Sequence, residues 1–300
     1  NGRFKALRRY LRPDAETATV RNMAQIFARD VQQWLRGLCD VDTPSVDRFL
    51  VGDPDTRVRE IATCWMPYFD TLRSAVEQGV NVVVAHEPAF YAHWDLDDAQ
   101  RDWHVAPEAA RERFWKAATE KKAWCKRHDL VVIRSHDVPD RMSPGGMAEC
   151  FAKQLGFDED RLVHSEDYFR VYGVDAQPAG AVASSIATHL RDVGQPGVGF
   201  YGDASRRVNS VGVGTGCYCD PLQLMHTPAD LFIVVDDVLR CWTHGTFAAD
   251  TGTPMVVVNH GSSEEAGMRH LATLLAEQFS PTPVVHLPTG CSYRWVLPEF

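Results

Sequence analysis

Short apolar runs rich in β-branched residues recur along this chain, and segments of helical periodicity separate them. The runs are 80–85, 130–133, 211–213, 231–235, 255–258 and 284–286. This composition is typical of strands that are buried on both faces of a sheet. Strands that alternate with helices pack as a sheet covered by helices, so the pattern predicts an α/β fold with central sheets.

Helices are predicted where apolar residues recur at steps of three and four. The first runs from Val20 to Leu38, and the others are 70–78, 107–127, a short helix between Gly146 and Gly156, 181–191 and 263–278. Pro107 suits the first turn of its helix, because no backbone N–H is needed there. The two halves of the chain meet near 157–180, which is the best candidate for a domain boundary.

The composition excludes several classes of protein. The 300 residues include 31 Lys and Arg against 40 Asp and Glu, a net charge of −9, and 45% are hydrophobic, as in ordinary soluble globular proteins. There is no run of about 18 apolar residues, so no membrane-spanning helix is predicted. The excess of acidic residues argues against a broad electrostatic surface for binding nucleic acid. Residues 1–12 lack the apolar core of a signal peptide, and a cytoplasmic location is therefore expected.

The eight cysteines are spread too thinly for a disulfide-rich scaffold, and no C-x-x-C pair occurs. Cys217 and Cys219 form a lone C-x-C. It is either part of a thiolate metal site or a pair of small buried residues in a glycine-rich turn. The preceding residues 212–216 lack the spacing of a dinucleotide or phosphate-binding loop, and the chain has no G-x-S-x-G and no H-E-x-x-H.

Histidine and carboxylate residues occur together at the ends of three predicted strands. The segments are His86-Glu87, His136-Asp137 with Asp140, and His260 with Glu264-Glu265. Ligands of open α/β sheets gather outside the carboxyl ends of the strands, so the three segments can converge on one crevice. Imidazole nitrogen with carboxylate oxygen suits Zn, Fe, Mn or Ni. The segments also supply enough acids to bridge two nearby ions, and they predict a metal centre.

Each of these residues also has a purely structural interpretation. The alternatives are a backbone hydrogen-bond partner for His86, a solvated loop acid for Glu87, a turn former for Asp140 and a complement to a helix N-terminus for Glu264. Ser262 and Glu265 have the S-x-x-E spacing of a capping box. Glu265 is therefore predicted to cap the helix rather than to bind metal.

Four stretches of the chain resemble the NIF-three-like dinuclear metal-centre family, also known as GTP cyclohydrolase I type 2-like proteins. Residues 47–53 resemble its Trp-Asp-x-x-Gly-Leu-x-x-Gly region, and 82–91 resemble the strand that ends in His-His-Pro. Residues 135–157 resemble the His-Thr-Asn-Leu-Asp segment with its following Gly-Gly helix, and 259–275 resemble the late Gly-His-x-x-Ser-Glu-x-x-Gly helix start. The last two stretches are the most specific.

The resemblance implies a ligand set for two divalent transition metal ions, Fe, Mn or Zn. The implied ligands are His86, Glu87, Asp140, His260 and Glu264. Glu87 stands where the family commonly has a second His, and Asn259 stands where it has Gly. A carboxylate at the first of these positions makes the site more anionic and harder, which favours Fe or Mn.

The resemblance also implies an architecture and an assembly. We expect two α/β lobes, 1–157 and 158–300, with the C-terminal segment packing back on the first lobe and the metal site in the cleft between them. We further expect a ring-shaped homohexamer whose sites face an internal cavity.

Two functions follow from such a centre. The first is a metal-dependent hydrolase that activates water, on a C–N bond of a heterocyclic or amide substrate. In that case His136 orients a ligand or carries protons. His93 and Asp95 either contact the small-molecule substrate or are ordinary polar residues of the surface. The second is a non-enzymatic metal-trafficking or regulatory binding protein. Five candidate ligands for two ions leave coordination positions open, which favours a catalytic site over a site that only carries metal.

Overall fold

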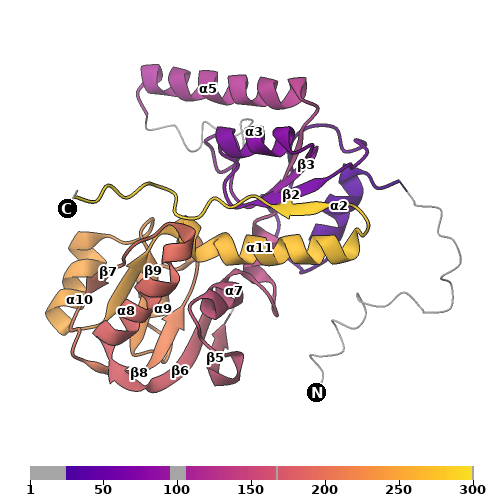
Figure 1. The fold of residues 1–300 in the computed structure, drawn as a ribbon. Helices are drawn as coiled ribbons and strands as arrows, with labels where there is room; N and C mark the ends of the chain where they lie inside the picture. Colours follow the sequence, from indigo (N-terminus) through magenta and orange to yellow (C-terminus); the bar gives the residue numbers. More distant parts are fainter. Residues whose placement is uncertain (1–24, 95–105, 167, 299–300) are drawn as a thin grey trace, which may run out of the picture.

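The computed structural model describes residues 25–94, 106–166 and 168–298. They form two β-sheets with helices packed against them (Figure 1). None of the described helices has the length and apolar character needed to cross a membrane. The predicted α/β fold with two central sheets is confirmed.

The first sheet has five strands in the order β1-β4-β3-β2-β11. The strands are β1 (Phe49–Val51), β2 (Ile61–Cys64), β3 (Val82–Ala85), β4 (Val131–Arg134) and β11 (Val284–His286). All neighbours are parallel except β1, which pairs antiparallel with β4. The last strand of the chain therefore lies beside β2, far from it in sequence. The domain boundary at residue 157 stays a prediction.

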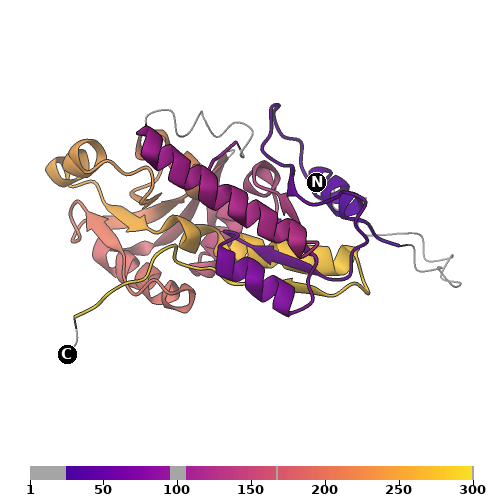
Figure 2. The same cartoon turned by 90° about the horizontal axis from the view of Figure 1, so that it is seen from above.

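Helices cover both faces of the first sheet because successive side chains of a strand point to opposite faces. Val83 and Ala85 belong to one buried cluster with α3 (Phe69–Glu77) and α5 (Glu108–Arg127). Val82 and Val84 belong to another with α2 (Ala28–Arg36) and α11 (His260–Gln278). Seen from above, α5 runs across the molecule with α3 beside it (Figure 2).

The second sheet has six strands in the order β5-β6-β8-β9-β10-β7. The strands are β5 (Leu162–Glu166), β6 (Phe169–Pro178), β7 (Gly199–Tyr201), β8 (Arg207–Val213), β9 (Leu231–Val235) and β10 (Met255–Val258). The central strands β8, β9 and β10 are parallel, and antiparallel strands flank them. The remaining described α-helices are α6 (Asp137–Arg141), α7 (Met147–Gln154), α8 (Ala179–His189), α9 (Pro221–Leu224) and α10 (Thr246–Thr251). The described residues also form the short 3₁₀ helices η2 (Glu159–Arg161), η3 (Arg191–Val193) and η4 (Gly216–Tyr218), and the π-helix η5 (Cys241–Gly245).

All six strands predicted from apolar runs are present, but the sequence patterns missed β1, β2, β5, β6 and β7. The β5–β6 hairpin occupies most of the segment 157–180 that was expected to join the two halves. The outer half of β6 has only exposed and half-buried residues, so it lacks the apolar run that marks a buried strand. Of the predicted helix 20–38, the structure describes α2, and residues 20–24 lie outside the described part.

The capping box predicted for Ser262 and Glu265 is wrong. Helix α11 begins at His260, and Asn259 is its N-cap, with a side chain that accepts a hydrogen bond from the Ser262 N–H. Glu265 instead is fully buried, and its carboxylate accepts hydrogen bonds from His286 Nε2 at 2.7 Å and from the Gly290 N–H at 2.9 Å. Because the helix starts earlier than predicted, Glu265 lies in its second turn and ties α11 to β11 and the segment after it.

Replacing Glu265 with Ala is expected to lower the free energy of unfolding by about 1–3 kcal/mol, since it leaves buried donors without an acceptor. Urea unfolding followed by circular dichroism measures the change. Glu277, exposed on the same helix, is the matched control, and Glu277→Ala should change stability little. Equal effects of the two substitutions would contradict the role assigned to Glu265.

Candidate metal centre

A cavity of about 430 Å³ lies between the carboxyl ends of strands from both sheets. Its wall contains Trp65, Met66, Glu87, Pro88, His93, His136, Asp140, Gly216, Cys217, Asp237, His260 and Glu264. His86 and Glu87 follow β3, His136 and Asp140 follow β4, and His260 and Glu264 follow β10. The three strand-end segments named in the sequence therefore meet at one place, because the carboxyl ends of parallel strands of each sheet face the same cavity.

The carboxylate of Glu264 lies between two imidazoles. Its Oε2 is 3.0 Å from His260 Nε2 and 3.3 Å from His86 Nε2. Trp65 Nε1 donates a hydrogen bond of 2.7 Å to the same oxygen and fixes its position. Glu264 is 1% exposed. A single buried carboxylate thus faces both histidines, as a ligand shared by two cations has to do.

The other two predicted ligands flank this arrangement. Asp140 Oδ1 is 3.4 Å from His86 Nε2, and Glu87 Oε1 is 3.4 Å from His260 Nε2. The structure therefore brings all five predicted ligand residues together, in the spatial order Asp140, His86, Glu264, His260, Glu87.

The Nδ1 atom of each imidazole has a polar contact outside the cluster, and this contact directs Nε2 toward the middle of the cluster. His86 Nδ1 is 3.2 Å from the Ser135 carbonyl oxygen, and His260 Nδ1 is 2.8 Å from Asp237 Oδ2. A ligating histidine is oriented by this kind of second contact. In the described part of the chain, His86 Nε2, His260 Nε2 and Asp140 Oδ1 are buried and make no well-aligned hydrogen bond, although they lie 3.0–3.4 Å from the neighbouring ionisable groups. Buried polar atoms are costly unless paired, and these three fit a bound cation.

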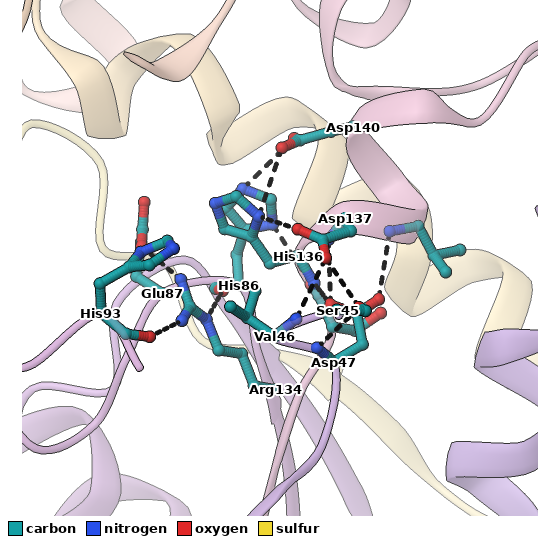
Figure 3. A network of polar contacts seen from close by, with 12 residues as sticks. Ser45, Val46, Asp47, His86, Glu87, His93, Arg134, His136, Asp137 and Asp140 are labelled. Carbon is teal, nitrogen blue, oxygen red and sulfur yellow. Dashed lines mark hydrogen bonds and ion pairs between the residues drawn. The ribbon is translucent and has the colours of Figure 1, made fainter. Parts of the chain in front are cut away.

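Arg134 holds the segment after β3 in place (Figure 3). Its side chain is 1% exposed, and it donates to the carbonyl oxygens of His86, at 3.1 Å, and of His93. Its Nη2 is 3.3 Å from Glu87 Oε2. The opposite oxygen, Oε1, is the one that faces His260. Glu87 is thus a buried acid with a fixed partner, and the alternative of a solvated loop acid is wrong.

His136 stacks on His86, with ring centroids 4.4 Å apart (Figure 3). Its Nδ1 is 3.0 Å from Asp137 Oδ1 and 3.4 Å from Asp140 Oδ2. Asp137 is fixed in turn by the Ser45 hydroxyl, which donates to it at 2.7 Å. His136 therefore lies on the cavity wall with an oriented ring. His93 also lines the cavity, whereas Asp95 lies outside the described residues.

The sequence patterns did not identify several residues that shape the site. Asp237 orients His260, Trp65 orients Glu264, and Asp47 accepts hydrogen bonds from the first N–H groups of α6. A signal for Asp237 was present, because Asp236-Asp237 follow the apolar run 231–235 directly. Nothing in the local sequence pattern marks Trp65, because its role depends on a residue 199 positions away.

The charges of the cluster stabilise one another. Burial lowers the pKa of His86, but Glu264 and Asp140 outweigh burial and raise it to about 9. Burial opposes the ionisation of Glu264, yet the two imidazoles hold its pKa well below the usual range. Burial raises the pKa of Asp140 to about 6. At neutral pH the metal-free cluster therefore holds protons on its imidazoles, where a cation would otherwise bind.

Comparison with known proteins identifies the family of this chain. Residues 45–288, most of the chain, match the family described as Duf34/NIF3 (NGG1p interacting factor 3). The chain belongs to the Duf34/NIF3 family. The resemblance noted in the sequence is thereby confirmed. None of the curated proteins matches the chain.

Several solved structures share the fold of this Duf34/NIF3 protein. Staphylococcus aureus SA1388 has a TM-score of 0.71 at 17% identity, over 90% of this chain and 99% of its own. A Bacillus cereus protein related to NIF3 has a TM-score of 0.68 at 13% identity, over 90% and 99%. The protein ybgI, described as of unknown function, has a TM-score of 0.66 at 16% identity, over 89% and 100%. At such identities these likenesses establish the fold.

Replacing Gly216 with Ala is expected to remove metal binding. Gly216 has a φ of +59°, and an added Cβ would lie 2.5 Å from Glu264 Oε1 and 3.3 Å from His260 Nε2. The added Cβ therefore collides with the Glu264 carboxylate and crowds the His260 ring, at a backbone conformation that favours glycine. Metal content after reconstitution, measured by mass spectrometry, checks this. Gly197→Ala is the control, because its Cβ would meet nothing within 4 Å. Full metal content in Gly216→Ala would contradict the geometry.

Metal affinity is expected to rise with pH between about pH 6 and 8. The raised pKa of His86, about 9, means that its ring carries a proton that has to leave when a cation binds. Each displaced proton steepens the dependence by roughly tenfold per pH unit. Competition with a metal indicator measures the affinity, and calorimetry in buffers of different ionisation enthalpy counts the protons. An affinity independent of pH would refute this account.

Proposed function

We propose that this protein is a metal-dependent hydrolase that uses two divalent transition metal ions, Fe, Mn or Zn, to activate water for cleavage of a C–N bond in a heterocyclic or amide substrate. The observation that carries the proposal is the buried Glu264 carboxylate between His86 and His260, at an open cavity. A storage site has no need of such a cavity, whereas a hydrolase needs room for its substrate.

The residues divide into two half-sites that share one acid. His86 and Asp140 would hold one ion, His260 and Glu87 the other, and Glu264 both. Bound ions of this kind lower the pKa of water and polarise the group under attack. Two histidines and three carboxylates do not fill the coordination of two ions, so water and substrate have positions to occupy.

The other residues of the cavity would bind substrate and move protons. His136 is oriented by Asp137 and is placed to take a proton from the attacking water and return it to the leaving nitrogen. Trp65, Met66 and Pro88 form an apolar wall that suits a planar ring. His93, on the same wall, is proposed to contact the substrate.

The location and assembly of this protein are proposed on separate grounds. The eight free cysteines suit a reducing compartment and support a cytoplasmic location, and the family resemblance supports a ring-shaped homohexamer. In such a ring the cavities of the copies would face a common interior.

Two substitutions distinguish metal binding from hydrolysis. His260→Ala is expected to lose both bound metal and hydrolysis, because it removes a ligand. His136→Gln is expected to keep the metal and to lower kcat by roughly 100-fold or more, the typical loss when an acid–base group is removed. Metal analysis and product assays with heterocyclic amides and nucleotides supply the two readouts. His164→Ala changes a half-buried histidine of β5 that lines no part of the cavity, and it should change neither.

The same experiment tests the alternative. Metal-loaded protein that turns over none of these substrates, and whose metal exchanges readily, would favour a metal-trafficking or regulatory protein. Protein that takes up no transition metal on reconstitution would refute both functions.

A further inference from the structure

The turn after β8 brings a sulfur atom to the rim of the candidate metal centre. Gly216 begins this turn, η4, and its Cα lies so close to the donors that an added Cβ would be 3.3 Å from His260 Nε2. Cys217 follows directly, and its side chain is exposed and lines the same cavity as Glu87, His260 and Glu264. The backbone contact at Gly216 thus positions a thiol beside the ligands from the other strands.

The thiol lies close to oriented donor atoms. Cys217 Sγ, a ring nitrogen of His260 and a carboxylate oxygen of Asp237 all lie within 4.8 Å of one another. With Zn–S and Zn–N distances of about 2.3 and 2.1 Å, a sulfur and a nitrogen bound to one tetrahedral ion lie about 3.6 Å apart, so side-chain movements of roughly 1 Å bring the thiol within range. His260 is 7% exposed, and its buried Nε2 makes no well-aligned hydrogen bond in the described part of the chain, although Glu264 Oε2 lies 3.0 Å away.

The two cysteines of the C-x-C pair are in different environments. Cys219 is fully buried, and its Sγ donates a hydrogen bond of 3.0 Å to the Ile233 carbonyl oxygen. No hydrogen bond of Cys217 Sγ occurs within the residues that the structure describes. The sequence left open whether the pair binds metal or packs in a turn. The structure indicates packing for Cys219 and leaves the sulfur of Cys217 at the cavity.

We propose that Cys217 supplies a thiolate ligand to the ion held by His260. The inference rests on the proposed metal-dependent function and adds a ligand to it. On binding, the S–H bond breaks, its proton goes to solvent, and a sulfur–metal bond forms without any oxidation or reduction. Asp237 stays hydrogen-bonded to His260 Nδ1 and orients the ring.

The added sulfur makes the two half-sites unlike. The half-site of His86 and Asp140 offers nitrogen and oxygen only, whereas the half-site of His260 and Glu87 gains a soft donor. Thiolate ligands favour Zn²⁺ and Co²⁺ over Mn²⁺. A thiolate at the half-site of His260 and Glu87 offsets the preference for hard metal ions that the Glu87 carboxylate confers there. The two half-sites are therefore expected to prefer different metals.

Titration with Co²⁺, without oxygen and with a phosphine reductant, tests the proposal on the full chain. The wild type is expected to show the near-ultraviolet charge-transfer band of a thiolate bound to cobalt, together with the visible bands of the ion itself. Cys217→Ser should lose the charge-transfer band and keep the visible bands. Cys219→Ser, the matched control, should keep both. With Zn²⁺ bound, X-ray absorption should detect a sulfur at about 2.3 Å that disappears in Cys217→Ser.

The titration distinguishes failure of the thiolate ligand from failure of the proposed metal centre. Visible cobalt bands without a charge-transfer band in the wild type would overturn the thiolate ligand and leave the metal function standing. Loss of the charge-transfer band in Cys219→Ser rather than in Cys217→Ser would overturn the assignment to Cys217. No uptake of Co²⁺ at all would overturn the proposed metal centre together with this inference. Because the side chain of Cys217 is exposed, its replacement by Ser should leave the fold intact.

Discussion

A negative charge is buried where the two sheets meet, and the surrounding structure compensates for it. Glu264 is almost fully excluded from solvent, and an isolated carboxylate in such a place would cost several kcal/mol. The charge is tolerated because two imidazoles and an indole N–H point at one of its oxygens. These partners come from the residue after β3, from the first turn of α11 and from the loop after β2. One electrostatic requirement therefore constrains all three segments.

The fold meets that requirement through long-range connections. Helix α11 starts beside the second sheet and packs along the first, so it carries Glu264 to the histidine that follows β3 (Figure 1). Glu265, the next residue, fastens the same helix to β11. Arg134 holds the segment that bears His86 and Glu87. The ligand residues are thus placed by neighbours that are themselves buried and hydrogen-bonded, which is the preorganisation that catalysis at a metal centre needs.

Some parts of this arrangement were predictable, and physical reasons separate them from the rest. Val82 to Ala85 form a strand because β-branched residues suit a sheet buried on both faces, and His86 follows at a strand end where ligands gather. The S-x-x-E spacing misassigns Glu265 because it is a local pattern, whereas the actual partners are His286, at the end of the next strand β11, and Gly290 in the segment after it. The strand β6 was missed because its exposed half has no apolar signature.

The sequence by itself determined the chemistry that is available: an α/β alternation with imidazole and carboxylate groups at three strand ends, and a C-x-C turn nearby. Only the tertiary structure decided which of these groups meet. It brought Trp65 to Glu264 across 199 positions, and it turned Cys217 to the cavity and Cys219 to the core. The physical reason is that side-chain spacing within a strand or helix is set by local geometry, whereas contacts between strand ends depend on how the two sheets pack.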